Sequence, residues 1–296
     1  MCLYTSKKKG IILKKDLICY KQLEKQEDGT WKTPIMYWII PKLDTMITPD
    51  KDAPEISNFG YKYRLGGGVI HAYLQNPIND NSVDGKLYRA IIPAGTEFWI
   101  SDDLCEVAAK KMYITSEEVL SLEDATLDTS SILSHPGADI MLTGGKRVPL
   151  SSEISPEDVV GIYSGDKVIL RDVNLDGIQF SDKPIPGVWR IALKDMDGEG
   201  NCKLLPPDLP ILKEARKQGG YIPALDELQE AFKNLLEVNI SRVTLGLPII
   251  PNNNWFWTST PRNSVDIWCC DNWFNNMGFC TDCYLRDGYA IYFLKS

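Results

Sequence analysis

The sequence has little of what several protein classes depend on. Its 296 residues include only two histidines, His71 and His135, which weakens most hydrolase and zinc-enzyme interpretations. No apolar run approaches the ~18–20 residues of a membrane-spanning helix, so membrane insertion is not expected. The net charge of −8 provides no surplus of Lys and Arg for phosphate contacts. Nucleic acid is therefore not an expected partner.

The first residues also lack a secretory signal. Lys7–Lys9 precede only a short apolar stretch, Ile11–Leu13, which runs into Lys14-Lys15. We therefore expect synthesis in a reducing cytoplasm, where the eight cysteines are thiols by default. A phage particle could still carry such a protein outside the cell.

The length predicts about two domains, because 296 residues can bury two cores. The strand and helix patterns along the chain make α+β the expected fold class. A β-rich domain is expected over residues 1–125, for attachment or oligomerisation, followed by a polar linker at 126–136. Its strands are predicted at 17–23, 31–37, 61–63, 69–74, 87–92 and 97–101. Asp102-Asp103 resembles a helix N-cap and predicts a short helix over Cys105–Met112.

The second domain is expected over residues 137–296. Turn residues and apolar runs predict strands at 139–142, 159–163, 167–170, 188–193, 255–258, 267–270 and 289–294. A helix is expected over Leu209–Gln218, ended by Gly219-Gly220, and a second over Pro223–Val238, whose leucines form one stripe.

One window has an unusual composition. Residues 251–294 contain no Lys, Glu or Gln, although the chain average predicts about six or seven, and they contain seven Asn. Asn, Tyr and other aromatic residues are typical of binding loops, which combine rigid contact area with adaptable hydrogen bonds. A buried aromatic core is the alternative, and we expect the tryptophans at period two, Trp255 and Trp257, to be core.

Three stretches carry a resemblance to a known family. Residues 220–231 read GYIPALDELQEA, Trp255–Thr260 read WFWTST, and Ile267-Trp268 follows. Together they resemble the C-terminal domain family of Legionella collagen-like proteins over about residues 137–296. The resemblance implies a C-type-lectin-like fold and a relation to the variable proteins of diversity-generating retroelements. The chain departs from the family at Ala224, at Pro261-Arg262 and in the longer spacing from Trp268 to Gly278.

The retroelement relation also implies a cause for the odd window. Mutating the adenines of AAC codons yields Asn, Asp, Ser, Tyr, Cys and Phe but never Lys, Glu or Gln. On this interpretation the stray cysteines are products of diversification, and the tryptophans and Met277 are invariant scaffold.

The same resemblance, with the residue chemistry, predicts a ligand-binding protein. The ligand is expected to be a cell-surface protein or glycan, the chain a homo-oligomer, and the location a phage tail. The expected contact residues are Arg262, Asn263, Ser264, Asp266, Cys269, Asp271, Phe274, Asn275, Asn276, Phe279, Thr281, Asp282, Cys283, Tyr284, Arg286 and Asp287.

Metal and enzyme alternatives remain open. Cys269-Cys270 with Cys280 and Cys283 could hold zinc, but neighbours in a strand point to opposite faces, so free thiols are preferred. Asp172-x-Asn174-x-Asp176 resembles the start of a calcium loop, yet Lys183 stands where the closing Glu belongs, which favours a turn. We therefore expect no cofactor, metal or catalytic residue. A metal- or thiol-dependent enzyme on a formylglycine-generating-enzyme-like fold, using Cys280 and Cys283, is the alternative function.

Overall fold

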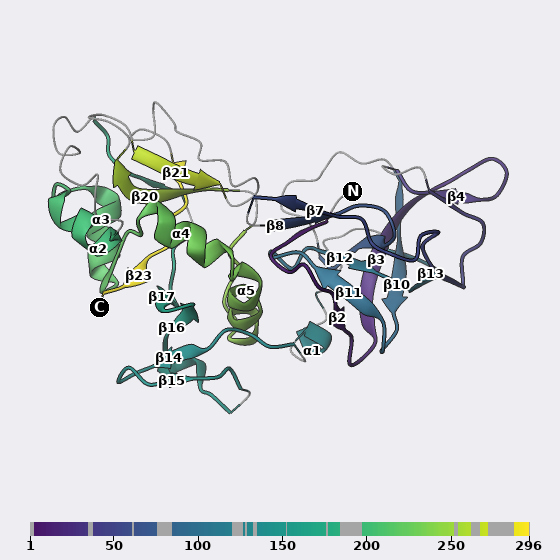
Figure 1. Cartoon of the computed structure of the whole chain (residues 1–296), viewed down its shortest axis with the longest axis horizontal. Helices are drawn as coiled ribbons and strands as arrows, with labels where there is room; N and C mark the ends of the chain where they lie inside the picture. Colours follow the sequence, from purple (N-terminus) through teal and green to yellow (C-terminus); the bar gives the residue numbers. More distant parts are fainter. Residues whose placement is uncertain are drawn as a thin grey trace. The chain divides into compact units, whose positions relative to one another are not determined.

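The computed structural model shows a mixed α+β protein that is rich in antiparallel strands (Figure 1). It forms two compact units, Met1–Pro136 and Gly137–Ser296. Among the described helices, none is long and apolar enough to cross a membrane. The structure describes residues 3–34, 38–60, 62–75, 85–119, 127, 129–132, 135–151, 153–175, 177–183, 197–251, 254–261, 267–271 and 287–295.

The first unit is built around one large sheet. Its strands follow the order β2-β11-β12-β9-β3-β10-β13-β6, and β4 joins β3 to β5. A second sheet has the order β1-β8-β7. The bounds are β1 Leu3–Thr5, β2 Ile11–Ile12, β3 Leu17–Lys25, β4 Trp31–Lys32, β5 Ile39–Ile40, β6 Thr45–Ile47, β7 Ile56–Phe59, β8 Lys62–Leu65, β9 Ile70–Tyr73, β10 Lys86–Ile92, β11 Glu97–Ile100, β12 Glu106–Ala109 and β13 Met112–Val119.

The hairpin predicted from Glu27–Thr30 is confirmed. β3 and β4 pair antiparallel, with Lys25 opposite Trp31. Gly29 has a φ of 83°, which a residue with a Cβ rarely adopts, and Asp28 Oδ1 accepts from Thr30 N at 2.9 Å. The turn residues therefore determine this connection locally.

The helix predicted over Cys105–Met112 is wrong, because the segment forms β12 and the start of β13. Val107, Ala108 and Ala109 are all buried between β11 and β9, so a continuous apolar run serves a central strand. Asp103 caps a turn and not a helix: its Oδ1 accepts from Cys105 N at 3.1 Å.

The segment predicted to be a linker is packed against the first unit in its described part. Helix α1 spans Thr129–Ile132. Ile132 is buried, and Ser131 Oγ donates to the Asp16 carbonyl at 2.7 Å. The His135 ring lies 5.1 Å from the Phe98 ring, centroid to centroid. The unit boundary at 136/137 thus follows a segment that contributes to a core.

The second unit combines a sheet with helices. Its main sheet has the order β15-β14-β16-β17-β23-β19, with the two further pairs β18-β22 and β20-β21. The strand bounds are β14 Ile140–Leu142, β15 Arg147–Val148, β16 Val159–Ser164, β17 Lys167–Leu170, β18 Ile178–Gln179, β19 Gly220–Tyr221, β20 Trp255–Pro261, β21 Ile267–Asp271, β22 Asp287–Gly288 and β23 Phe293–Leu294. A 3-10 turn, η2, covers Pro156–Asp158.

The helices of this unit pack against its strands. They are α2 Gly198–Leu204, α3 Pro210–Lys217, α4 Leu225–Phe232 and α5 Leu235–Thr244. α4 contacts β20 and β21, and α5 contacts β16 (Figure 1). The helix predicted over Leu209–Gln218 is confirmed as α3, with Gly219 at φ 77° just beyond its end.

The second predicted helix, Pro223–Val238, is in fact two helices. Asn234 interrupts it with φ −113° and ψ 17°, and its Nδ2 donates to the Glu230 carbonyl at 3.2 Å. The side chain thereby adds a second donor to a carbonyl at the end of α4, which also accepts from Lys233 N at 3.3 Å. The break redirects the chain, and α5 continues to Thr244, six residues past the predicted end.

Candidate functional site

Strands β20, β21 and β22 lie within the window of residues 251–294. They flank two segments of that window, residues 262–266 and 272–286, which we call the odd segments. β20 pairs with β21, with Phe256 opposite Cys270 and Trp257 opposite Cys269. The chain returns beside β20 through an isolated parallel bridge between Phe256 and Tyr289. Residues 262–266 therefore connect β20 to β21, and residues 272–286 connect β21 to β22.

Aromatic packing fixes these strands in the unit. Trp257 is 3% exposed, and its Nε1 donates to the Ile178 carbonyl at 3.0 Å. The Phe256 ring lies 5.2 Å from the Phe232 ring of α4. A Cβ on Gly288 would lie 2.2 Å from Trp257 Nε1, so only glycine allows this approach. The packing around Trp257 therefore depends on the absence of a side chain at Gly288.

The tryptophans do not share one environment. Trp257 is buried as expected, whereas Trp255 is 42% exposed, so its prediction as core is wrong. Period two puts both side chains on one face of β20, but Trp255 stands at the strand's first residue, where that face opens to solvent. The window of residues 251–294 thus contains an exposed aromatic side chain on a described strand.

Strand β20 also caps α4. Ala224 occupies the N-cap position, where its methyl group cannot accept a hydrogen bond. Thr260 supplies the missing acceptor from another element: its Oγ1 accepts from Leu225 N at 2.9 Å. In addition, Ser259 N donates to the Pro223 carbonyl at 2.8 Å. A tertiary contact therefore compensates for the missing side-chain acceptor at Ala224.

Glu227 joins four elements beneath this strand. Its Oε2 accepts from Ala224 N at 2.9 Å and from Gly198 N, at the start of α2, at 3.1 Å. Its Oε1 accepts from the Tyr221 hydroxyl at 3.2 Å and pairs with Lys167 Nζ at 3.0 Å. Burial, followed by the Glu227 charge, raises the pKa of Tyr221 far above its ordinary value. The Glu227 carboxylate therefore has a structural role, because its hydrogen bonds and its ion pair hold these four elements together.

A buried arginine and asparagine fix the chain that enters the window. Asn239 Oδ1 accepts from Ile250 N at 2.7 Å, and its Nδ2 donates to the Ile250 carbonyl at 2.9 Å. Arg242 Nε donates to the Pro248 carbonyl at 2.5 Å and its Nη1 to the Arg171 carbonyl at 3.3 Å. Because these hydrogen bonds hold Pro248 and Ile250 against α5, the helix fixes the position at which the window of residues 251–294 begins.

Most predicted contact residues lie outside the described residues. Cys269 is described and only 3% exposed, so including it in a contact surface is a correction: its strand position directs it into the unit. Asp271 and Asp287 lie on β21 and β22, where only their backbones are described. Outside the described residues lie Arg262, Asn263, Ser264, Asp266, Phe274, Asn275, Asn276, Phe279, Thr281, Asp282, Cys283, Tyr284 and Arg286.

The candidate metal residues are only partly described. Cys269 and Cys270 are both buried and adjacent on β21, while Cys280 and Cys283 lie outside the described residues. Asp172 pairs with Arg171 at 3.0 Å, and Asp176 is likewise outside. Within the described ranges, His, Cys, Asp and Glu form no group of three that could hold a metal ion.

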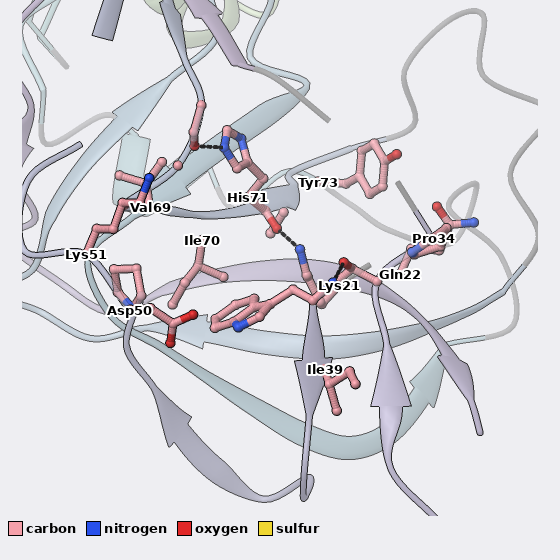
Figure 2. A pocket seen from close by; sticks show the side chains of 17 residues that line it. Lys21, Gln22, Pro34, Ile39, Asp50, Lys51, Val69, Ile70, His71 and Tyr73 are labelled. Atoms are coloured by element: carbon pink, nitrogen blue, oxygen red, sulfur yellow. Dashed lines mark hydrogen bonds between the residues drawn. The ribbon is translucent and has the colours of Figure 1, made fainter. Parts of the chain in front are cut away.

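The first unit holds a second candidate site that sequence reasoning missed. A cavity of about 650 Å³ is bordered by residues of β3, β5 and β9 and by the loops after β4, β6 and β8. Lys21 and His71 both line it, and both are buried (Figure 2). A signal existed: Lys21 falls in the inward phase of β3, which Leu17, Cys19 and Leu23 otherwise fill with apolar side chains.

No family model, curated protein or solved structure matches this chain. The resemblance drawn from residues 220–231, 255–260 and 267–268 therefore stays a prediction.

Proposed function

We propose that this chain is a ligand- or receptor-binding protein whose second unit is C-type-lectin-like and displays a diversified surface from residues 262–266 and 272–286. One observation carries the proposal: residues 251–294 contain no Lys, Glu or Gln while being crowded with Asn and aromatic residues. Adenine-directed mutation of AAC codons produces this alphabet, and ordinary surface selection does not.

The described scaffold supports this interpretation. Both odd segments begin and end on strands that Trp257, Phe256 and Gly288 hold in a buried aromatic cluster. Binding residues are commonly carried on connections between rigid elements, because the frame tolerates changes in those connections. Trp255, exposed at the start of β20, lies opposite Asp271, the residue from which the chain continues into 272–286, and adds aromatic contact area at that end of the hairpin.

The proposed ligand is a protein or glycan on a cell surface, and the proposed setting is a phage tail. Paratope-like composition suits such targets, because aromatic and amide side chains contact both peptide and sugar surfaces. The first unit would then serve attachment or homo-oligomerisation.

Genomic sequence tests the diversification. We expect a reverse transcriptase gene nearby and a near-copy of the 251–294 coding region that differs mainly at adenines. Codons at 262–266 and 272–286 that show no adenine bias would remove the basis of the proposal.

Mutational tolerance tests the division between scaffold and display. We expect Asn275→Ser with Asn276→Ser, and separately Phe279→Ser, to leave the thermal midpoint within about 2 °C. Trp257→Ala should lower stability by about 3–5 kcal/mol, because it removes a buried indole. Equal destabilisation by both kinds of substitution would contradict a displayed surface.

The alternative function, a metal- or thiol-dependent enzyme, can be tested by metal analysis of the purified protein. Stoichiometric zinc or copper in purified protein, lost in the Cys280→Ser and Cys283→Ser variants, would favour it over a binding protein. We expect no such stoichiometric metal.

A further inference from the structure

The cavity of the first unit brings together side chains that are distant in the sequence. Lys21 comes from β3 and His71 from β9, while Trp38 precedes β5 and Asp50 follows β6. In Figure 2, Asp50, Lys51 and Val69 lie to the left of Lys21 and His71, and Tyr73 and Gln22 lie to the right. A volume of about 650 Å³ is within the range of pockets that bind small molecules.

Lys21 brings an under-used cation to this cavity. Its side chain is 8% exposed, and the described residues give its ammonium one hydrogen bond, to the His71 carbonyl. Two of its three N–H donors are therefore available to a ligand oxygen. Burial lowers the pKa of Lys21 to about 8, although the nearby Cys19 and Glu106 act to raise it. The charge of Glu106 therefore offsets the desolvation of this ammonium only in part.

His71 is a neutral ring beside this cation. Its Nε2 lies 3.0 Å from the Gly66 carbonyl, and because a carbonyl can only accept, Nε2 carries the proton. Nδ1 is buried, and it has no hydrogen-bond partner among the described residues. Burial lowers the pKa of His71 to about 4, so the ring carries no charge near pH 7. Lys21 is therefore the charged member of the pair, which suits a ligand with an anionic oxygen.

The glycine loop argues against a phosphate. Gly66 N donates to the Glu55 carbonyl at 2.9 Å, and Gly67 N donates to Glu55 Oε2 at 3.2 Å. Glu55 also pairs with Lys51. These backbone donors and the second lysine are thus already engaged, unlike the free N–H groups of a phosphate-binding loop. One available ammonium matches a monoanion.

The remaining lining favours a sugar ring. The lining includes the aromatic residue Trp38, a type that packs on the C–H groups of a pyranose, and the polar residue Asp50, a type that pairs with hydroxyls. Apolar walls with a few convergent polar groups are the usual make-up of a specific small-molecule pocket.

We propose that this cavity binds a small hydroxylated carboxylate of the sugar-acid class, with its carboxylate on Lys21 Nζ. The proposal is independent of the surface in the second unit, because it concerns other residues and a small ligand.

Calorimetric titration of the full chain with D-glucuronate and D-glucose tests the proposal, because the two sugars differ mainly in the carboxylate. We expect glucuronate to bind at least tenfold more tightly than glucose near pH 7. Lys21→Met should weaken glucuronate binding at least tenfold. Lys86→Met, on the exposed end of β10, is the matched control and should leave binding unchanged.

A proton readout separates a direct contact from a structural effect. A bound carboxylate stabilises the charged ammonium, so binding near pH 8 should take up protons, and affinity should fall above about pH 9. Lys21→Met should abolish that uptake while its thermal midpoint stays at or above that of the parent chain.

Several outcomes would overturn the proposal. They are equal affinity for glucuronate and glucose, unchanged binding in Lys21→Met, and tighter binding of inorganic phosphate than of glucuronate. No heat with glucuronate, galacturonate or gluconate at millimolar concentration would overturn it as well.

Discussion

Each unit buries a cation, and the two cations have different surroundings. Arg242, in the second unit, is fully buried and bridges α5 to the Pro248 and Arg171 carbonyls, although its Nη2 has no partner among the described residues. Lys21, in the first unit, has one carbonyl partner and borders a cavity. Burial lowers the pKa of both, to about 10 for Arg242 and about 8 for Lys21.

The difference separates a structural cation from one available to a ligand. Arg242 fixes two chain segments that would otherwise have unpaired carbonyls, whereas Lys21 contacts one carbonyl of a strand already held by its sheet. The first unit does pair another buried lysine: Lys62 Nζ lies 3.5 Å from Asp102 Oδ2. Lys21 has no ion pair of this kind among the described residues.

The largest expected effect is at Arg242. We expect Arg242→Met to lower the free energy of unfolding by about 4 kcal/mol, because two buried carbonyls lose their donor. Urea unfolding measures it, and Arg147→Met, which removes an exposed ion pair with Asp139, should cost under about 1 kcal/mol. Equal costs would erase the distinction between a structural cation and an ordinary surface one.

Lys21→Met should have the opposite sign. Because the folded pKa is about 8 and the ordinary value is 10.5, the folded state disfavours the charged lysine at neutral pH. Its removal should stabilise the chain by up to about 3 kcal/mol near pH 7. The gain should shrink as pH rises from about 8 to about 10.5, since the unfolded state then also loses its proton. A stability loss at pH 7 would instead make Lys21 a structural residue like Arg242.

Glu227→Ala should rank next. It removes the acceptor for Ala224 N, Gly198 N and the Tyr221 hydroxyl, so we expect a loss of about 2–3 kcal/mol in thermal or urea unfolding. Glu230→Ala on the same helix is the matched control, because Glu230 is exposed and forms a surface ion pair with Lys233. We expect this substitution to cost under about 0.5 kcal/mol. Similar stability losses in the two variants would mean that the hydrogen bonds of Glu227 contribute no more than a surface ion pair does.

The smallest expected effect is at the helix cap that β20 supplies. Thr260→Val removes the acceptor for Leu225 N and should cost about 1 kcal/mol, whereas Thr260→Ser keeps the oxygen and should cost less. Circular dichroism melts of both variants measure the difference. An unchanged midpoint in Thr260→Val would show that α4 needs no cap beyond Glu227.

Local patterns predicted much of the secondary structure. Strand β3, its hairpin to β4 and helix α3 follow from alternation and turn residues that act within a few positions. The two helix errors have different causes. Cys105–Met112 has a helix-like start, yet Val107–Ala109 lie between two strands that the local sequence does not specify. The helix predicted over Pro223–Val238 breaks at Asn234, where a local contact, from Asn234 Nδ2 to the Glu230 carbonyl four residues earlier, accompanies the break.

The candidate sites divide in the same way. The composition of residues 251–294 is a property of the sequence and needs no structure to be seen. Lys21 was visible only as one lysine in the inward phase of β3, and His71 as an isolated histidine. Their common cavity depends on β3 and β9 meeting through the sheet, with Tyr20 opposite Tyr73.

The sequence by itself determined the mixed α+β composition, most strand positions and the segment with a restricted residue alphabet, because these depend on neighbours a few residues apart. Only the tertiary structure decided that Thr260 caps α4, that Cys269 is buried and that Lys21 and His71 share a cavity. Those outcomes depend on which distant segments lie together, and on the desolvation that follows when they do.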